Sequence, residues 1–371
     1  MRIGILTITP SVGFGGILQA YALRYIFEQM GHSVQIINYT TNISLKNKLT
    51  YFAKSLIKKI NGEFVKYSPQ AELRYRSQNI IPFIKDNLNF SKKATSSTQL
   101  KHLINSSYDI AIVGSDQVWR PKYVHGIENY FFAGINQRIK KIAYAASFGV
   151  DSFEYSEEEA RACSNLLKCF TYVSVREQSG VKLLKDNLRY EKHVFCDLDP
   201  TMLAGLSAFQ SFILSTNKSK DKVFSYILDP TDRKTMLLDE VARILDKSIC
   251  NFNTNAENPN KPLKERIAPP VEDWVNGIFH SSFVVTDSFH GCAFSILFNK
   301  PFIVYVNKNR GSERFISILS QFNLCDRMIE NFDDFDPALL QREIEWGNIN
   351  KTIMNQRIEI LSRLKIAINQ Y

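Results

Sequence analysis

The segment TDSFHG, residues 286–291, lies between two apolar runs and contains side chains that can do chemistry. Histidine titrates near neutral pH, so His290 can donate or accept a proton. An ordinary strand-to-helix turn would explain the same residues, but the neighbours Asp287 and Ser288 favour an active-site loop. A serine hydrolase is disfavoured because the sequence has no GxSxG motif. We expect no metal site, since no second ligand lies at metal-site spacing from His290.

A glycine-rich turn follows the apolar run at 2–9, with Gly13, Gly15 and Gly16 in front of a helical pattern. Backbone N–H groups at the start of a helix can bind an anion. Gln19 could add a polar contact to the same ligand. The spacing is not the GxGxxG of dinucleotide-binding proteins. A tight turn explains these glycines about as well as an anion site does.

The stretch GSDQVW ends a third apolar run, at 108–114. It places Ser115, Asp116, Gln117 and Trp119 at the end of a predicted strand. Asp116 could simply cap a following helix. We favour a functional role for the cluster, because so many polar side chains at one strand end are unusual.

Two further clusters carry positive charge. Arg176 and Glu177 end a short predicted strand, and Lys308, Arg310 and Arg314 follow a later one. The planar guanidinium group of arginine matches two oxygens of a carboxylate or phosphate. The alternatives are a surface Arg176–Glu177 pair and a solvated basic loop.

These clusters must be positioned by alternating strands and helices, which predict parallel sheets. We therefore expect an α/β fold with two Rossmann-like domains, at 1–205 and 206–345, and a cleft between them. Ligands bind beyond the carboxyl ends of strands in such sheets. A final helix within 346–371 is expected to pack back on the first domain. Strands are predicted at 2–9, 33–39, 108–114, 141–147, 172–175, 193–196, 222–228, 248–253, 282–286 and 301–306. Helices are predicted at 17–30, 156–169, 178–187, 232–246, 271–280, 291–298, 314–322 and 348–369.

Composition indicates a globular protein of a reducing compartment. The 371 residues include six cysteines, none in a CxxC pair, and carry a net charge of +9. The first residues read as a strand rather than a signal peptide, and no apolar run of about 18 residues occurs. We therefore expect a cytoplasmic protein. The charge suits anionic partners, but nucleic acid is disfavoured because no nucleic-acid-binding signature is present.

Taken in order, five stretches resemble the succession found in the polysaccharide pyruvyl transferase family. They are the glycine turn with LQAYAL, then GSDQVW, VRE, TDSFHG and a basic loop with ERF, over roughly residues 1–325. The resemblance implies the two-domain GT-B fold. It also implies transfer of pyruvate from phosphoenolpyruvate to two hydroxyls of a sugar, in a cell-surface polysaccharide or its lipid-linked precursor, forming a ketal. Phosphoenolpyruvate would be a co-substrate, the glycan the acceptor, and no cofactor is expected.

The family's histidine and cationic positions would correspond to His290, Arg176 and Arg314. We expect His290 to donate a proton or bind phosphate, and Asp116 to act as a base toward the acceptor hydroxyl or to position it. The expected donor-binding residues are Arg176, Arg314, Ser288 and Gly291. The expected acceptor side of the cleft consists of Gly15, Gly16, Gln19, Gln117 and Trp119.

Residues 44–62 form a separate pattern, in which one helical face is apolar and five lysines occur without an acid. Such helices can lie on anionic membranes, which would place the protein peripherally on the inner face of the membrane. We favour a helix packed on its own domain. Two other functions stay open: a GT-B nucleotide-sugar glycosyltransferase, and a non-catalytic protein that binds glycan or membrane.

Overall fold

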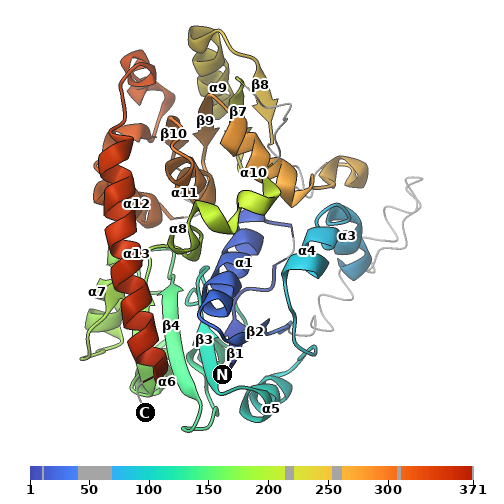
Figure 1. Cartoon of the computed structure of the whole chain (residues 1–371), viewed down its shortest axis with the longest axis vertical. Helices are drawn as coiled ribbons and strands as arrows, with labels where there is room; N and C mark the ends of the chain where they lie inside the picture. Colours follow the sequence, from blue (N-terminus) through green and yellow to red (C-terminus); the bar gives the residue numbers. More distant parts are fainter. Residues whose placement is uncertain (11, 41–68, 214–220, 253–260, 307–310, 370–371) are drawn as a thin grey trace.

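A computed structural model describes residues 1–10, 12–40, 69–213, 221–252, 261–306 and 311–369 (Figure 1). In these residues, two parallel β-sheets lie one above the other, with helices packed around each. The segment 44–62 and the basic residues Lys308 and Arg310 lie outside the described residues, so their predicted roles stay predictions.

The N-terminal sheet has the order β2-β1-β3-β4-β5-β6, with parallel pairing throughout. Every residue of β3 is buried, as expected for a parallel sheet covered on both faces. The strands are β1 (Arg2–Leu6), β2 (Ser33–Ile36), β3 (Ile110–Val113), β4 (Lys140–Ala146), β5 (Phe170–Val175) and β6 (Phe195–Cys196). The helices are α1 (Phe14–Gln29), α3 (Pro69–Arg76), α4 (Ile81–Asn87), α5 (Ser97–Ser107), α6 (Glu157–Leu167), α7 (Gln178–Lys182) and α8 (Pro200–Ala204).

The C-terminal sheet has the order β11-β10-β9-β7-β8 and is also parallel. Its strands are β7 (Val223–Tyr226), β8 (Ile249–Asn251), β9 (Phe283–Thr286), β10 (Phe302–Tyr305) and β11 (Met328–Ile329). Its helices are α9 (Asp232–Leu245), α10 (Val271–His280), α11 (Phe289–Leu297) and α12 (Glu313–Gln321). The predicted fold class, α/β with two Rossmann-like parallel sheets, is confirmed.

One apolar core joins the two sheets. Phe14, at the start of α1, stacks on Trp274 of α10 with ring centroids 5.7 Å apart, and it also contacts Tyr226 of β7. Burial of this apolar surface fixes the glycine turn before α1 against the C-terminal sheet. The two halves of the chain are therefore held together by the same hydrophobic effect that forms each of them.

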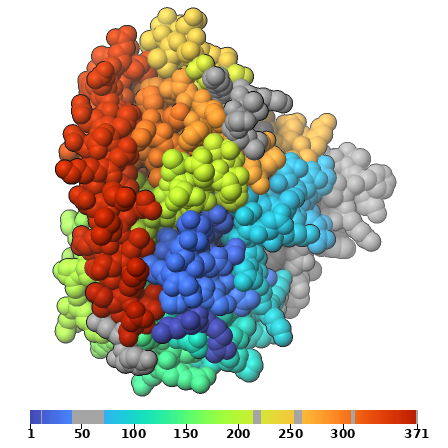
Figure 2. All heavy atoms as spheres, in the orientation of Figure 1, coloured from blue at the N-terminus to red at the C-terminus, as the bar shows by residue number. Residues whose placement is uncertain are grey.

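The last helix, α13 (Trp346–Asn369), runs along the side of the molecule past both sheets (Figure 2). Its buried residues Ile349, Ile353, Ile360 and Leu364 are four or seven positions apart and therefore share one face of the helix. Gln356 accepts a hydrogen bond from Gln321 of α12, and Lys140 of β4 donates to the carbonyl of Ile368. No helix among the described residues is both long enough and apolar enough to cross a lipid bilayer.

Most predicted elements coincide with observed ones, although most strands end one to three residues earlier than predicted, whereas β5, β6 and β9 end where predicted. The helices α3, α4 and α5 were not predicted, and neither were α8 and β11. Strands β1 to β6 fall within 1–205 and β7 to β11 within 206–345, while the domain boundaries themselves stay a prediction.

Candidate active site

A pocket of about 130 Å³ lies where strand ends of both sheets meet. The turn before α1 and the loop after β3 form one side, and the loops after β7 and β9 form the other. This is the position where parallel α/β sheets bind ligands. The residues that line it are Gly13, Gly15, Gly16, Asp116, Gln117, Tyr226, Leu228, Asp287, Ser288, Phe289, His290 and Arg314.

His290 lies in the first turn of α11 and faces the glycine turn. A Cβ atom at Gly15 would lie 2.1 Å from Nδ1 of His290, so only glycine permits this approach. The imidazole is nearly buried, and its Nε2 has no hydrogen-bond partner among the described residues. The nearest carboxylate oxygen, Oδ2 of Asp199, is 3.7 Å from Nε2, which is too long for a hydrogen bond. His290 therefore has a buried nitrogen without a hydrogen-bond partner in the described residues, with Asp199 as its neighbouring carboxylate.

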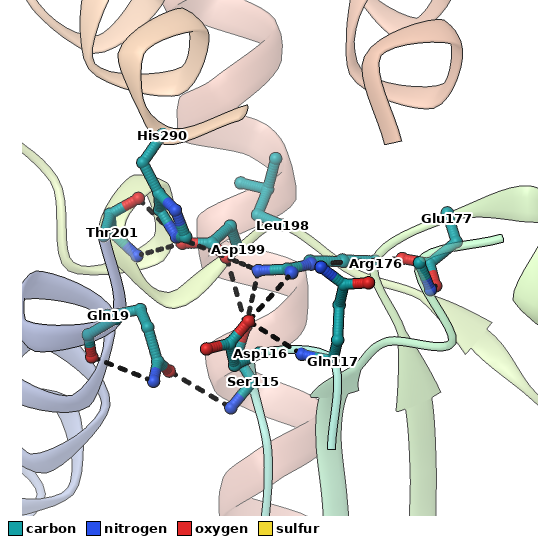
Figure 3. A network of polar contacts seen from close by, with 12 residues as sticks. Gln19, Ser115, Asp116, Gln117, Arg176, Glu177, Leu198, Asp199, Thr201 and His290 are labelled. Carbon is teal, nitrogen blue, oxygen red and sulfur yellow. Dashed lines mark hydrogen bonds and ion pairs between the residues drawn. The ribbon is translucent and has the colours of Figure 1, made fainter. Parts of the chain in front are cut away.

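Asp199 is a buried carboxylate at the centre of the site, as Figure 3 shows. It follows β6 and caps α8, accepting hydrogen bonds from the backbone N–H and the hydroxyl of Thr201 at 3.0 and 2.8 Å. Ser115 donates to its Oδ2 at 3.1 Å. Burial alone would raise the pKa of Asp199, but His290 and Arg176 outweigh burial and hold that pKa well below its usual range. Asp199 is thus ionised, and its negative charge stabilises the positive charge of Arg176 and of a protonated His290.

Arg176 is buried at the end of β5 and connects three carboxylates. Its Nη1 donates to Asp199 at 2.9 Å, Nη2 lies 3.7 Å from Asp116, and Nε lies 3.9 Å from Glu177. Nε and Nη2 have no hydrogen-bond partner in the described part of the chain. Glu177 is itself buried and accepts from the backbone N–H of Phe148 at 2.7 Å. The alternative of an exposed Arg176–Glu177 surface pair is therefore wrong.

Arg314 provides a second buried guanidinium from α12. Burial and, second, the charge of Arg176 lower the pKa of Arg314 to about 10, so it stays a cation at neutral pH. The guanidinium carbons of Arg176 and Arg314 lie 4.7 and 5.5 Å from the ring centroid of Phe289. The guanidinium groups of Arg176 and Arg314 therefore lie close together beside Phe289. This arrangement suits a ligand with more than one negative charge.

Asp116 is the more exposed acid of the pocket, with 22% of its side chain accessible. Its Oδ1 accepts from the backbone N–H of Gln117 at 2.8 Å, and the residues that follow form turns rather than a helix. The alternative role of Asp116 as a helix cap is therefore wrong. Gln117 accepts a hydrogen bond from Arg120 at 3.3 Å, which holds its side-chain oxygen. Asp116 and Gln117 form the rim on the N-terminal side.

The sequence model of the family described as polysaccharide pyruvyl transferase matches residues 14–309, most of the chain. The chain belongs to the polysaccharide pyruvyl transferase family. All residues of the pocket except Gly13 and Arg314 lie within the matched range. No curated protein matches the sequence.

Solved structures show the fold of this pyruvyl transferase family member. The UDP-GlcNAc 2-epimerase of Methanocaldococcus jannaschii is 16% identical with a TM-score of 0.50, covering 98% of this chain and 100% of the epimerase. The S. aureus MnaA–UDP co-structure is 14% identical with a TM-score of 0.51, covering 99% of this chain and 96% of the MnaA chain. The chain therefore has the GT-B fold, as the family resemblance implied.

Most of the predicted site residues come together in this family member. His290, Asp116, Arg314 and Ser288 line the pocket together with Gly15, Gly16 and Gln117, and Arg176 lies behind them. Ser288 caps α11 by accepting from the N–H of Gly291 at 3.4 Å. Gly291, a predicted donor-binding residue, does not line the pocket, and a Cβ there would meet Thr286 Oγ1 at 2.4 Å.

Two predicted acceptor residues do not reach the pocket. Trp119 is fully buried and stacks on Phe131 with centroids 4.9 Å apart, while its Nε1 donates to the carbonyl of Tyr130. Gln19 is also buried, where it donates to Thr7 and accepts from the N–H of Ser115. Gln19 holds the loop after β3, and Trp119 is a core residue, because a large aromatic side chain gains most from burial.

The carboxylate close to His290 is not the one that lies near it in the sequence. Asp287, beside His290 in the sequence, accepts from Lys234 at 2.7 Å and from the N–H of Leu228 at 2.6 Å, so it fixes the loop after β7. The acid close to His290 is Asp199, which sequence reasoning missed. Its position after a predicted strand and before Pro200-Thr201 was a capping signal that could have identified it. In the described part of the chain, no three or more His, Cys, Asp or Glu side chains are arranged to hold a metal ion.

Proposed function

We propose that the protein transfers pyruvate from phosphoenolpyruvate to two hydroxyls of a sugar, in a cell-surface polysaccharide or its lipid-linked precursor. The observation that carries this proposal is that Arg314 and His290 line one small pocket, with the guanidinium group of Arg176 buried directly behind it against the ring of Phe289. Phosphoenolpyruvate carries a carboxylate and a phosphate, so its site needs several cationic or N–H donors. Family membership supports the same reaction.

The size of the pocket favours this donor over a nucleotide-sugar. Pockets for drug-sized ligands measure roughly 300–1,000 Å³, whereas this pocket measures about 130 Å³. A three-carbon phosphate ester suits that volume, while a nucleoside diphosphate sugar would extend well beyond it. A glycosyltransferase that uses the same fold is therefore the less favoured function.

The chemistry requires one proton donor, one base and a site for the departing phosphate. Protonation of the methylene carbon by His290 gives an oxocarbenium-like centre at the neighbouring carbon, and the anion of Asp199 stabilises the charged imidazole beforehand. A sugar hydroxyl attacks this centre and gives its proton to Asp116. Phosphate leaves between Arg176 and Arg314 and takes the proton held by Asp116. The second hydroxyl then closes the ketal and gives its proton to His290, which restores the proton donor. Preorganised cations stabilise the leaving group without reorganisation during the reaction.

The test measures inorganic phosphate released by the purified protein from phosphoenolpyruvate with galactose- or mannose-type acceptors. His290→Asn should lower the rate by about 10²–10⁴-fold, the range of general acid–base catalysis. His102→Asn is the matched control, because His102 is exposed on α5. Equal rates for His290→Asn and wild type would overturn the role of His290. Turnover of a UDP-sugar without turnover of phosphoenolpyruvate would overturn the function.

A further inference from the structure

Two arginines of α13 bind the chain on either side of Asp199. Arg363 donates to Oδ1 of Asp197 at 2.7 Å, two residues before Asp199. Arg357 donates to the carbonyls of Leu203 and Ala204 at 2.8 and 3.0 Å, at the end of the helix that Asp199 caps. The final helix thus contacts both flanks of the segment that carries the central carboxylate, as its course in Figure 1 allows.

The contact with Asp197 is buried and closely packed. Asp197 is 4% exposed and also accepts from the hydroxyl of Tyr172 at 2.5 Å. Arg363 lies over the ring of Phe195 with its guanidinium carbon 4.3 Å from the centroid. Because a buried carboxylate is costly without a partner, Arg363 fixes the position of Asp197 rather than merely touching it.

The contact with α8 is equally specific. Carbonyl groups at the end of a helix lack partners within the helix, and Arg357 satisfies two of them. Gly205 follows with a φ of +75°, and a Cβ there would lie 2.5 Å from Nη1 of Arg357. The glycine therefore allows the guanidinium to reach the backbone of α8.

Helix α8 is a single short helix, so a shift at its end is transmitted to Asp199 at its start. Asp199 in turn contacts Arg176 at 2.9 Å and lies 3.7 Å from His290. Helix α13 also bonds to α12, the helix of Arg314, through Gln356 and Gln321 at 2.7 Å. Neither Arg357 nor Arg363 lines the pocket.

We propose that Arg357 and Arg363 are positioning residues of the active site, which hold Asp199 in place against His290 and Arg176 from outside the pocket. The effect on turnover rests on the proposed function, whereas the effect on the geometry around His290 does not. A purely structural role of α13 would lower stability and leave the surroundings of His290 unchanged. The decisive measurement therefore has to report from His290 itself.

The experiment uses the full chain labelled with [¹³C]histidine, and the His290 signal is assigned from its loss in His290→Asn. Arg357→Gln removes one contact and Arg357→Lys keeps its charge. The double variant Asp197→Asn/Arg363→Gln removes the other contact without leaving a buried charge unpaired. Arg243→Gln is the control, because Arg243 forms an exposed pair with Glu240 on α9.

We expect the His290 signal to shift in Arg357→Gln and in the double variant, less in Arg357→Lys, and not in Arg243→Gln. In Arg357→Gln and in the double variant, kcat/KM for phosphoenolpyruvate should fall by about ten- to a hundredfold, the cost of a catalytic group misplaced by up to 1 Å, while Arg243→Gln should keep the wild-type value. An unchanged His290 signal in the folded variants overturns the proposal, even if they melt earlier. If wild type releases no phosphate, the proposed function fails, and the His290 signal still decides the positioning role.

Discussion

An alanine at position 15 should disable the site more than it destabilises the fold. The added Cβ would lie 2.1 Å from Nδ1 of His290, 2.5 Å from Cγ and 2.9 Å from Cβ, whereas carbon atoms normally meet at about 3.5–4.0 Å. Rotation of the ring cannot relieve the contact with Cβ, so the imidazole or the turn has to move by about 1 Å. Such a displacement can cost about a hundredfold in rate, which is about 2.7 kcal/mol of barrier.

Gly347→Ala is the matched control for Gly15→Ala. Gly347 is the second residue of α13 as Gly15 is of α1, and nothing lies within 4 Å of its added Cβ. At a compatible site this substitution stabilises a protein by about 0.4–1 kcal/mol, while overpacking costs about 1–3 kcal/mol. The assays are kcat/KM for phosphate release and urea unfolding of both variants. Wild-type activity in Gly15→Ala would refute the argument that the Gly15–His290 approach limits the site.

Two further predictions concern buried charges. Because His290 and Arg176 hold the pKa of Asp199 below its ordinary value of 3.8, the ionised carboxylate stabilises the fold above about pH 4, and this contribution is lost as the pH falls. The melting temperature of Asp199→Asn should therefore depend less on pH below 4 than that of wild type, and an equal dependence would contradict the pairing. Lys234→Met removes the cation beside buried Asp287 and should cost about 3–5 kcal/mol in urea unfolding. The same change at exposed Arg243 should cost less than about 1 kcal/mol, so similar losses in the two variants would argue against a buried pair.

The fold could be predicted because its strands are continuous apolar runs ending in polar clusters. Residues 108–114 and 282–286 show this pattern, and β3 and β9 lie within them. The helices α3 and α4 were missed because they are short, and α3 is largely polar. Propensity in such segments is weak, and packing against the rest of the chain decides their structure.

The site could be predicted only where its residues follow strands with recognisable motifs. Asp116 and Arg176 lie close together because β3 and β5 end on the same edge of the N-terminal sheet, and His290 meets them from the end of β9 in the C-terminal sheet. Asp199 was missed because its function depends on partners 84 and 23 residues away in the sequence, Ser115 and Arg176. Asp287 shares a loop with His290, three residues further along the chain, yet its side chain accepts a hydrogen bond from Lys234. Local sequence identifies which residues are polar, but only the packing decides which of them meet.

The stacking of Phe14 on Trp274 opposes separation of the two lobes of the protein. Many two-lobed proteins admit ligands by swinging their lobes apart about a hinge. Here such a swing would expose aromatic surface from both lobes to water, at a cost that grows with the area uncovered. Ligand entry and exit should therefore use rearrangements of the loops at the rim, while the two lobes stay joined.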